Sequence, residues 1–119
     1  MKVRIKSVHG HGDFYKEYVL MEVVEDCNIG HFILADSTYT GEHQVSNRLR
    51  HILWIPDKTV KQGDLVSVWT KGGANTTVTN DQGQTVHRFF WGLETAVWND
   101  EGDCAILFNI NNWQFSPTK

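Results

Sequence analysis

Residues 2–8 of the chain read Lys-Val-Arg-Ile-Lys-Ser-Val. Charged and apolar side chains alternate along this stretch, so that Val3 and Ile5 fall on one side and the cationic residues between them on the other. A repeat of two residues is typical of a β-strand with one buried face, whereas an amphipathic helix repeats about every 3.6 residues. This stretch therefore predicts a half-buried strand, and it sets the pattern for the rest of the chain.

The residues that follow continue as short strands separated by turns. His-Gly-His-Gly-Asp at residues 9–13 predicts a turn, because glycine adopts positive φ angles at little cost. The nearly continuous apolar run Tyr18–Val24 predicts a central strand. Further strands are expected at Gly30–Ala35, Arg48–Ile55, Leu65–Lys71, Val86–Trp91 and Asp103–Ile110. No stretch of ten residues has the apolar spacing of an amphipathic helix.

Two polar stretches predict long loops. Asp36–Asn47 contains Gly41, and Lys71–Gln84 is the part of the chain richest in glycine and asparagine, which we expect to be mobile. Short strands with a turn signal about every 8–12 residues are typical of an all-β sandwich or barrel. With 119 residues and no repeat or linker, the chain is expected to form a single domain over residues 1–119.

Composition narrows the class of protein. Hydrophobic residues make up 40% of the chain and charged residues 21%, which is ordinary for a globular domain. The net charge of −3 gives no overall attraction to nucleic acid or to an anionic membrane. No apolar stretch approaches the roughly 18 residues of a membrane helix, and the N-terminal residues do not resemble a signal peptide. We therefore expect a cytoplasmic protein with no membrane partner, although removal of an export signal would leave the same sequence.

The chain has two cysteines, Cys27 and Cys104, too few for a disulfide scaffold or a four-cysteine zinc site. We expect two reduced, mostly buried thiols. The alternative is a single Cys27–Cys104 bridge, which requires an oxidising compartment and Cα atoms within about 7 Å.

Several segments, taken in order, resemble the lamin tail domain family. The stretch from Pro56 through Val-Lys-Gln-Gly-Asp-Leu-Val-Ser-Val-Trp at residues 60–69 is similar to the family's proline strand end, glycine turn and tryptophan-ending strand. Ile29–Leu34 lies where the family has a glycine, an aromatic residue and a strand, with Phe32 in place of the usual tryptophan. The remaining similar segments are Val3–Val8, Phe90-Trp91 and Val97–Leu107.

The resemblance implies an immunoglobulin-like sandwich of two packed antiparallel sheets. Lamin tail domains bind proteins, and those of nuclear lamins also bind chromatin and DNA. Similar domains of bacteria and archaea occur alone or beside hydrolases and nucleases, where they are taken to be interaction units. Because this chain lacks the heptad repeats of a lamin rod, it is most similar to these free-standing members.

The five tryptophans are many for so short a chain. Two sheets about 10 Å apart need large inward side chains, and Trp69 and Trp91 lie in alternating strands that suit this role. Trp54 is ambiguous, whereas Trp98 adjoins a turn and Trp113 lies near the terminus. An exposed tryptophan at either of these last two positions would be a candidate binding residue.

Two motifs are candidates for metal binding. His9, His11 and Asp13 have the spacing of a partial metal site that a third histidine would complete, but an exposed turn is the simpler interpretation; the candidates for that histidine are His31, His43, His51 and His87. The acidic stretch at residues 100–103 resembles a fragment of a calcium loop, but it lacks the alternating ligands and final glutamate of an EF-hand, and a hairpin turn is the simpler interpretation. No nucleophile elbow or phosphate loop is present. We therefore expect no cofactor and no enzymatic activity.

The sequence predicts a non-catalytic binding or scaffolding module with an unknown protein partner. Residues 46–75 carry five bases and two acids, a net charge of +3, so Arg48 and Arg50 are candidates for weak DNA binding. A carbohydrate-binding sandwich is the second hypothesis, and it requires two of Trp54, Trp98 and Trp113 to be exposed and coplanar. A small metal-dependent enzyme using His9 and His11 is the third. Pairing of edge strands between copies of the chain is a further prediction.

Overall fold

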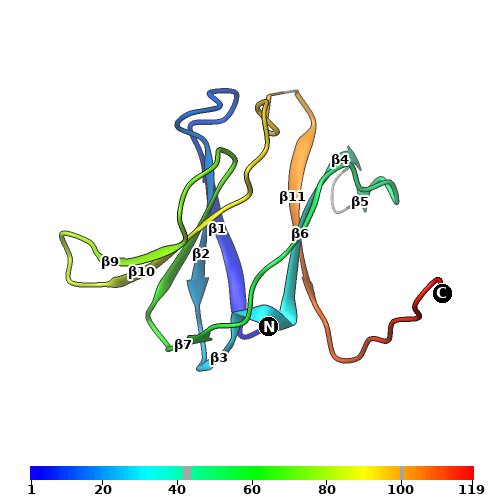
Figure 1. The fold of residues 1–119 in the computed structure, drawn as a ribbon. Helices are drawn as coiled ribbons and strands as arrows, with labels where there is room; N and C mark the ends of the chain where they lie inside the picture. Colours follow the sequence, from blue (N-terminus) through cyan, green and yellow to red (C-terminus); the bar gives the residue numbers. More distant parts are fainter. Residues whose placement is uncertain (42–43, 100) are drawn as a thin grey trace.

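Two layers of β-strands make up the molecule (Figure 1). The structure is a computed structural model and describes residues 1–41, 44–99 and 101–119. The first layer is a five-stranded sheet in the order β1, β2, β8, β10, β9, formed by Val3–His9, Tyr18–Val23, Leu65–Trp69, Thr85–Phe90 and Thr76–Thr79 respectively. The alternation predicted for residues 2–8 is confirmed, because Val3 is fully buried and Ile5 packs against the core.

The second layer is built on β4 (Phe32–Gly41), the longest strand. It pairs with β11 (Asp103–Asn109) along one side and with β5 (Gln44–Val45) and β6 (Ile52–Trp54) along the other. The short pair β3 (Cys27–Asn28) and β7 (Thr59–Val60) lies at one end, and a single 3-10 turn, η1 (Ile29–His31), leads into β4. The prediction of an all-β sandwich is confirmed.

No helix among the described residues is long and apolar enough to cross a membrane.

One strand pair departs from the antiparallel arrangement that the family resemblance implied. β10 runs parallel to β8, with Val86 opposite Leu65 and Phe90 opposite Trp69. The chain leaves β8, crosses the end of β10 to form the edge strand β9, and returns through a hairpin, so that β10 lies between β8 and β9. A connection of this kind brings two strands together in the same direction without an intervening helix.

The interpretation of Lys71–Gln84 as a loop was therefore wrong, because the segment contains β9 and most of a hairpin. Asn80 organises the turn, since its side-chain oxygen accepts hydrogen bonds from the backbone N–H groups of Gln82 (3.0 Å) and Gln84 (2.9 Å). Gly73 lies against the Phe90 ring so closely that a Cβ there would be 2.7 Å from a ring carbon. The glycines and asparagines of this segment thus serve turn geometry and close packing.

The prediction of a loop over Asp36–Asn47 was also wrong for the first part of that segment, because β4 continues to Gly41. Polar side chains are tolerated there because they are hydrogen-bonded. Ser37 is fully buried, and its hydroxyl contacts the carbonyl oxygens of Ser46 and Arg48, both at 2.9 Å. His43 lies outside the described residues, as does Asp100 of the acidic turn.

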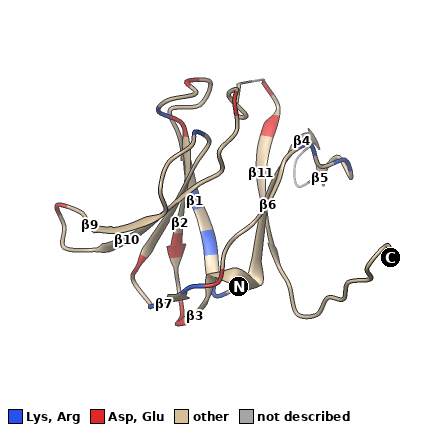
Figure 2. Cartoon of the chain, viewed as in Figure 1, with Lys and Arg blue, Asp and Glu red and all other residues tan. Residues whose placement is uncertain are grey.

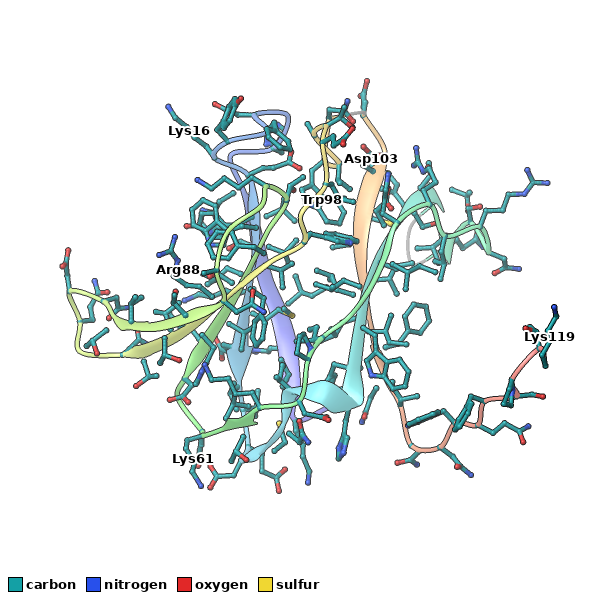
Figure 3. All side chains as sticks on the ribbon, in the orientation of Figure 1. Lys16, Lys61, Arg88, Trp98, Asp103 and Lys119 are labelled. Atoms are coloured by element: carbon teal, nitrogen blue, oxygen red, sulfur yellow. The ribbon has the colours of Figure 1, made fainter. Side chains whose placement is uncertain are left out.

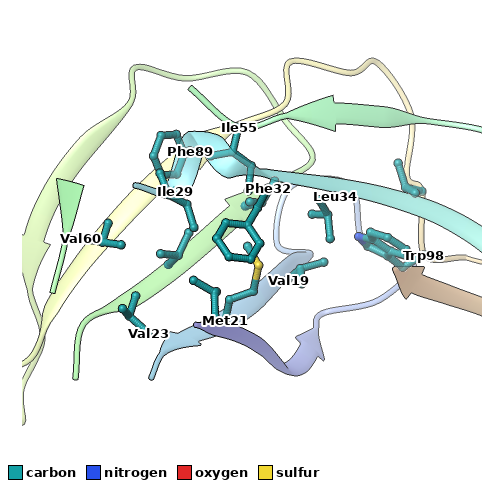
Figure 4. Close-up of a cluster of buried hydrophobic side chains, with 14 residues drawn as sticks. Val19, Met21, Val23, Ile29, Phe32, Leu34, Ile55, Val60, Phe89 and Trp98 are labelled. Atoms are coloured by element: carbon teal, nitrogen blue, oxygen red, sulfur yellow. The ribbon is translucent and has the colours of Figure 1, made fainter. Parts of the chain in front are cut away.

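The core lies between the two layers (Figure 4). It contains aliphatic side chains from both sheets together with Phe32, Phe89 and Trp98. Phe32 lies at the centre of this core, with 1% of its surface exposed. Trp91 packs against the same cluster while remaining partly exposed.

Trp69 is not in the core, contrary to expectation. Its neighbours Val66 and Val68 face inward, which leaves Trp69 on the outer face of the five-stranded sheet. There it forms a row of stacked rings running from His9 through Tyr18 and Trp69 to Phe90, one ring from each of four strands in register. Lys71 and Arg88 lie over the Trp69 ring at 5.1 and 5.5 Å from its centre.

Glu17 holds together the end of the sandwich at which the β1–β2 turn lies. It has no exposed surface, and its carboxylate accepts hydrogen bonds from the Thr70 hydroxyl and from the backbone N–H groups of Gly12 (3.1 Å) and Val97 (2.8 Å). These partners lie in three different segments that connect strands: β1 to β2, β8 to β9, and β10 to β11. A buried carboxylate is stable only when it is hydrogen-bonded in this way.

Candidate functional site

The outer face of the β11–β4–β6 sheet carries apolar side chains in register. Ile33 of β4 lies between Trp54 of β6 and Phe108 of β11, and in the next row Ala35 lies between Ile52 and Ile106. We call Ile33, Ile52, Trp54, Ile106 and Phe108 the apolar face. β6 has no charged residue and β11 has only Asp103, at one end, which Figure 2 shows in red on an otherwise tan strand.

Much of the apolar face is accessible to solvent. The exposed fractions of Ile52, Trp54 and Phe108 are 55%, 45% and 40%. Such a contiguous group of large apolar side chains is unusual on a solvated sheet, where outward positions are normally polar. The arrangement therefore marks a candidate docking surface.

The segment after β11 borders this face. The backbone N–H of Ile110 donates to the carbonyl of His31 (2.7 Å), and the chain then runs without regular structure to Lys119, turning away from the sandwich (Figures 1 and 3). Trp113 of this segment contacts Trp54, with ring centres 4.9 Å apart and ring planes at 87°. The structure thus brings together two of the tryptophans that the sequence singled out.

These two rings form the walls of an open cavity of about 450 Å³, which we call the tryptophan corner. Trp54 is fixed there by a hydrogen bond from its indole N–H to the Gly30 carbonyl (2.8 Å). The other described residues that line the cavity are Gly30, His31, Ile55, Pro56 and Asp57. Its volume lies within the range typical of small-ligand sites, about 300–1,000 Å³.

Asp57 is placed at the corner by local packing around Gly30. Asn28 Nδ2 donates to one oxygen of the Asp57 carboxylate (3.3 Å), and Asn28 Oδ1 accepts from the backbone N–H groups of Gly30 (2.8 Å) and Lys58 (3.1 Å). A Cβ on residue 30 would be 2.1 Å from the Asp57 carboxylate, so the close packing of residue 30 against Asp57 requires glycine. Asp57 is itself exposed.

Trp98, the third tryptophan considered for binding, is 4% exposed and lies between the layers (Figure 3). It therefore offers no face to a ligand. The sugar-binding hypothesis required two exposed, coplanar tryptophans. Trp54 and Trp113 are exposed, but their nearly perpendicular planes do not provide a flat platform.

Arg50 is engaged by acidic side chains. Its guanidinium lies 2.9 Å from Asp103 and 3.7 Å from Asp36, whose side chains are 5% and 2% exposed. Asp36 also accepts hydrogen bonds from the backbone and ring nitrogens of His51. Arg48 is exposed. The bases of residues 46–75 do not share one surface, because Lys71 lies on the opposite sheet and Lys61 lies beside Asp26.

The candidate metal ligands are engaged in separate contacts. His9 stacks on Tyr18 and contacts the Ser7 hydroxyl (2.6 Å), while Asp13 accepts from the backbone N–H of Tyr15 (3.1 Å). His11 lines a different cavity, beside Trp98 and Cys104. Over the described parts of the chain, no three His, Cys, Asp or Glu side chains are grouped so as to hold a metal ion.

Both cysteines are free thiols and partly buried. Burial raises the pKa of Cys27, and burial together with the neighbouring Asp103 raises that of Cys104. A raised pKa lowers the thiolate fraction at neutral pH and so opposes nucleophilic chemistry.

A buried acid–base pair links β8 to β10. Asp64 contacts His87 Nε2 at 2.8 Å, and His87 is 5% exposed. Desolvation alone would raise the pKa of the Asp64 carboxyl, but the hydrogen bonds from His87 and from the backbone N–H of Lys61 outweigh it and hold this pKa below its ordinary value of 3.8. Among the described residues, no serine, threonine or cysteine side chain is hydrogen-bonded to this pair, and we assign the pair a structural role.

Sequence reasoning missed the apolar face. The signal was present in Cys104–Phe108, an uncharged run that is apolar at both odd and even positions. Such runs normally indicate strands that are buried on both faces. β11, however, is an edge strand, and none of its residues is fully buried.

Comparison with known proteins gives no match: no protein-family model matches the chain, and no curated protein or solved structure is significantly similar to it.

Proposed function

We propose that this protein is a non-catalytic binding module that docks a partner protein on the apolar face of its four-stranded sheet. The observation that carries this proposal is the exposure of Ile52, Trp54 and Phe108 in adjacent, in-register rows. Aromatic and large aliphatic residues are enriched at the centres of protein interfaces. The resemblance to lamin tail domains, which bind proteins, agrees with this proposal.

The chemistry beside the face favours a different protein over a second copy of this chain. Asp57 and the protruding Trp113 lie next to Trp54 at one edge of the face, and no lysine or arginine belongs to the face itself. A twofold contact places the same surface on both sides, so the apolar face of a second copy would itself offer no lysine or arginine to Asp57. A partner with an apolar surface and a neighbouring cation is complementary to both features.

The test is affinity capture from the native source with substitutions on the two outer faces. Ile52→Lys and Phe108→Lys place a charge within the apolar face, whereas Val78→Lys is a matched change at an exposed position (40%) on β9 of the other sheet. We expect a specific partner to be retained by the wild type and by Val78→Lys and lost by both other variants. Capture that is unchanged in all variants would contradict the proposal.

Self-association is distinguished in the same experiment by light scattering of the purified protein. A dimer that dissociates on Phe108→Lys would show that a second copy occupies the face, and the proposal of a different partner would then be wrong.

A further inference from the structure

We infer that the tryptophan corner is a binding site for a methylated ammonium group, such as the end of an N-methylated lysine side chain. That this side chain belongs to the docking partner rests on the proposed function, whereas the site itself does not. The shape of the corner, its charge and the hydration of the ligand each support this assignment.

The shape comes from Trp54 and Trp113. Their planes meet at 87°, and each ring is exposed, by 45% and 59% respectively. Two perpendicular aromatic walls allow one cation to contact both rings, whereas a sugar ring stacks best on a single flat face. Cations are attracted to the negative faces of aromatic rings, and tryptophan is the most effective.

The charge comes from Asp57. One of its carboxylate oxygens accepts from Asn28 Nδ2, and among the described residues no donor is recorded for the other. The described residues that line the cavity include no lysine or arginine. The corner is therefore complementary to a positive group and repels an anion.

The hydration of the ligand favours a methylated ammonium over a simple one. A simple ammonium is a strongly hydrated point charge with three N–H donors. The open corner offers a carboxylate and an imidazole as side-chain acceptors, so it replaces little of that hydration shell. Methyl groups remove the donors and add apolar surface that contacts the tryptophans and Pro56, which makes the methylated cation the better ligand.

The test uses choline as the probe, with two small molecules for comparison. Ethanolamine has the same charge but no methyl groups, and 3,3-dimethyl-1-butanol has the shape of choline without the charge. Binding is followed through the indole N–H signals of the five tryptophans in ¹⁵N-labelled protein. We expect choline to shift the signals of Trp54 and Trp113 in a saturable manner and to leave that of buried Trp98 unchanged.

We expect both comparison molecules to bind about tenfold more weakly than choline, because each lacks either the cation–π attraction or the methyl contacts. Trp113→Ala should abolish the shift of Trp54, and Asp57→Asn should weaken choline binding about threefold. The matched control Asp81→Asn, in the β9–β10 turn, should bind like the wild type.

No shift with choline, equal binding of the neutral molecule, or equal binding of ethanolamine would each overturn the inference.

The variant Ile52→Lys distinguishes a failure of this inference from a failure of the proposed function. If this variant loses the partner protein but still binds choline, both proposals stand. If partner capture depends on Ile52 while choline never binds, the inference alone fails; if choline binds while capture is unchanged by Ile52→Lys and Phe108→Lys, the docking proposal alone fails.

Discussion

Glu17 is the residue on which one end of the fold depends. Replacing it with alanine leaves the Thr70 hydroxyl and the N–H groups of Gly12 and Val97 without their partner. Thr70 and Val97 are buried, and each unsatisfied buried group costs about 1–3 kcal/mol, so we expect Glu17→Ala to lower the free energy of unfolding by at least about 2 kcal/mol. Urea denaturation measures this difference.

The control for this prediction is Glu25→Gln, at an exposed position just after β2. It should change the free energy of unfolding by less than about 0.5 kcal/mol. A Glu17→Ala variant as stable as the wild type would show that the three connections are held by other contacts.

Asp64 makes stability depend on pH in a defined direction. Because the folded-state pKa of its carboxyl lies below the ordinary value of 3.8, the ionised form stabilises the folded protein above that value. This contribution is lost as the pH falls through the lowered pKa, when the carboxylate takes up a proton.

We therefore expect Asp64→Asn to be less stable than the wild type at pH 7, by about 1–3 kcal/mol, with the difference shrinking steadily below about pH 4. Thermal melts of both proteins between pH 2 and pH 7 measure it. A difference that stays constant over this range would contradict the role of the ionised carboxylate.

At the scale of the strand, the row of stacked rings on the five-stranded sheet contributes stability outside the core. Trp69 contacts Tyr18 with ring centres 4.4 Å apart and Phe90 at 6.3 Å, and two cations cover its faces. Aromatic pairs contribute about 0.5–1.5 kcal/mol beyond the area they bury. The row therefore links four strands on the side facing solvent.

We expect Trp69→Ala to lower the free energy of unfolding by about 2–3 kcal/mol, although Trp69 is not a core residue. A double-mutant cycle with Tyr18→Ala should give a coupling energy of about 1 kcal/mol. Val78→Ala, on β9 of the same sheet, is the control and should have little effect. Additive effects of Trp69→Ala and Tyr18→Ala would show that the rings do not stabilise each other.

The strands themselves were largely predictable. Alternation located β1, and β-branched or apolar runs located β2, β8, β10 and β11, because burial of one or both faces leaves a direct trace in the sequence. β9 and the second half of β4 were missed, since they are polar and are held by hydrogen bonds to segments distant in sequence, as at Ser37.

The site was less predictable than the strands. Trp54 and Trp113 were identified individually, but their contact depends on the path of the chain after β11, which no local pattern specifies. Trp69 was expected in the core and lies on the outer face of its sheet, whereas Trp98, a candidate for an exposed binding residue, is buried in the core. Alternation gives the relative orientation of neighbours, and only the tertiary fold decides which side is buried.

Two of the edge strands, β1 and β11, also differ in how far they discourage pairing. β1 carries Arg4 and Lys6 and has a bulge between Ile5 and Ser7, features that discourage pairing with another strand. β11 has no such protection beyond Asp103. Pairing between copies of the chain stays a prediction, and β11 is the strand through which we expect it.

At the scale of the whole molecule, the C-terminal segment is separable from the sandwich. Residues 111–119 are all exposed. We expect their removal to change the free energy of unfolding by less than about 1 kcal/mol, because little packed surface is lost. At the same time, uncovering Trp54 should increase the fluorescence of a hydrophobic dye bound to the native protein.

Differential scanning calorimetry and dye titration of the shortened chain measure these two effects. The comparison protein is Trp113→Ala, which should give the same increase in dye binding with the rest of the segment in place. A loss of more than several kcal/mol on shortening would show that the segment is part of the folded unit.

The position of β10 between β8 and β9 has a consequence for how the chain assembles. The β9–β10 hairpin is closed by five residues around Asn80, so it forms from neighbours in the sequence, whereas the parallel pairing with β8 joins residues 20 or more apart. We expect the hairpin to form early and then to pair with β8 as a unit. Because this pairing joins residues distant in sequence, we expect it to be the rate-limiting step of folding. Substitutions in the Asn80 turn should then slow refolding, whereas changes in β11 should mainly speed unfolding.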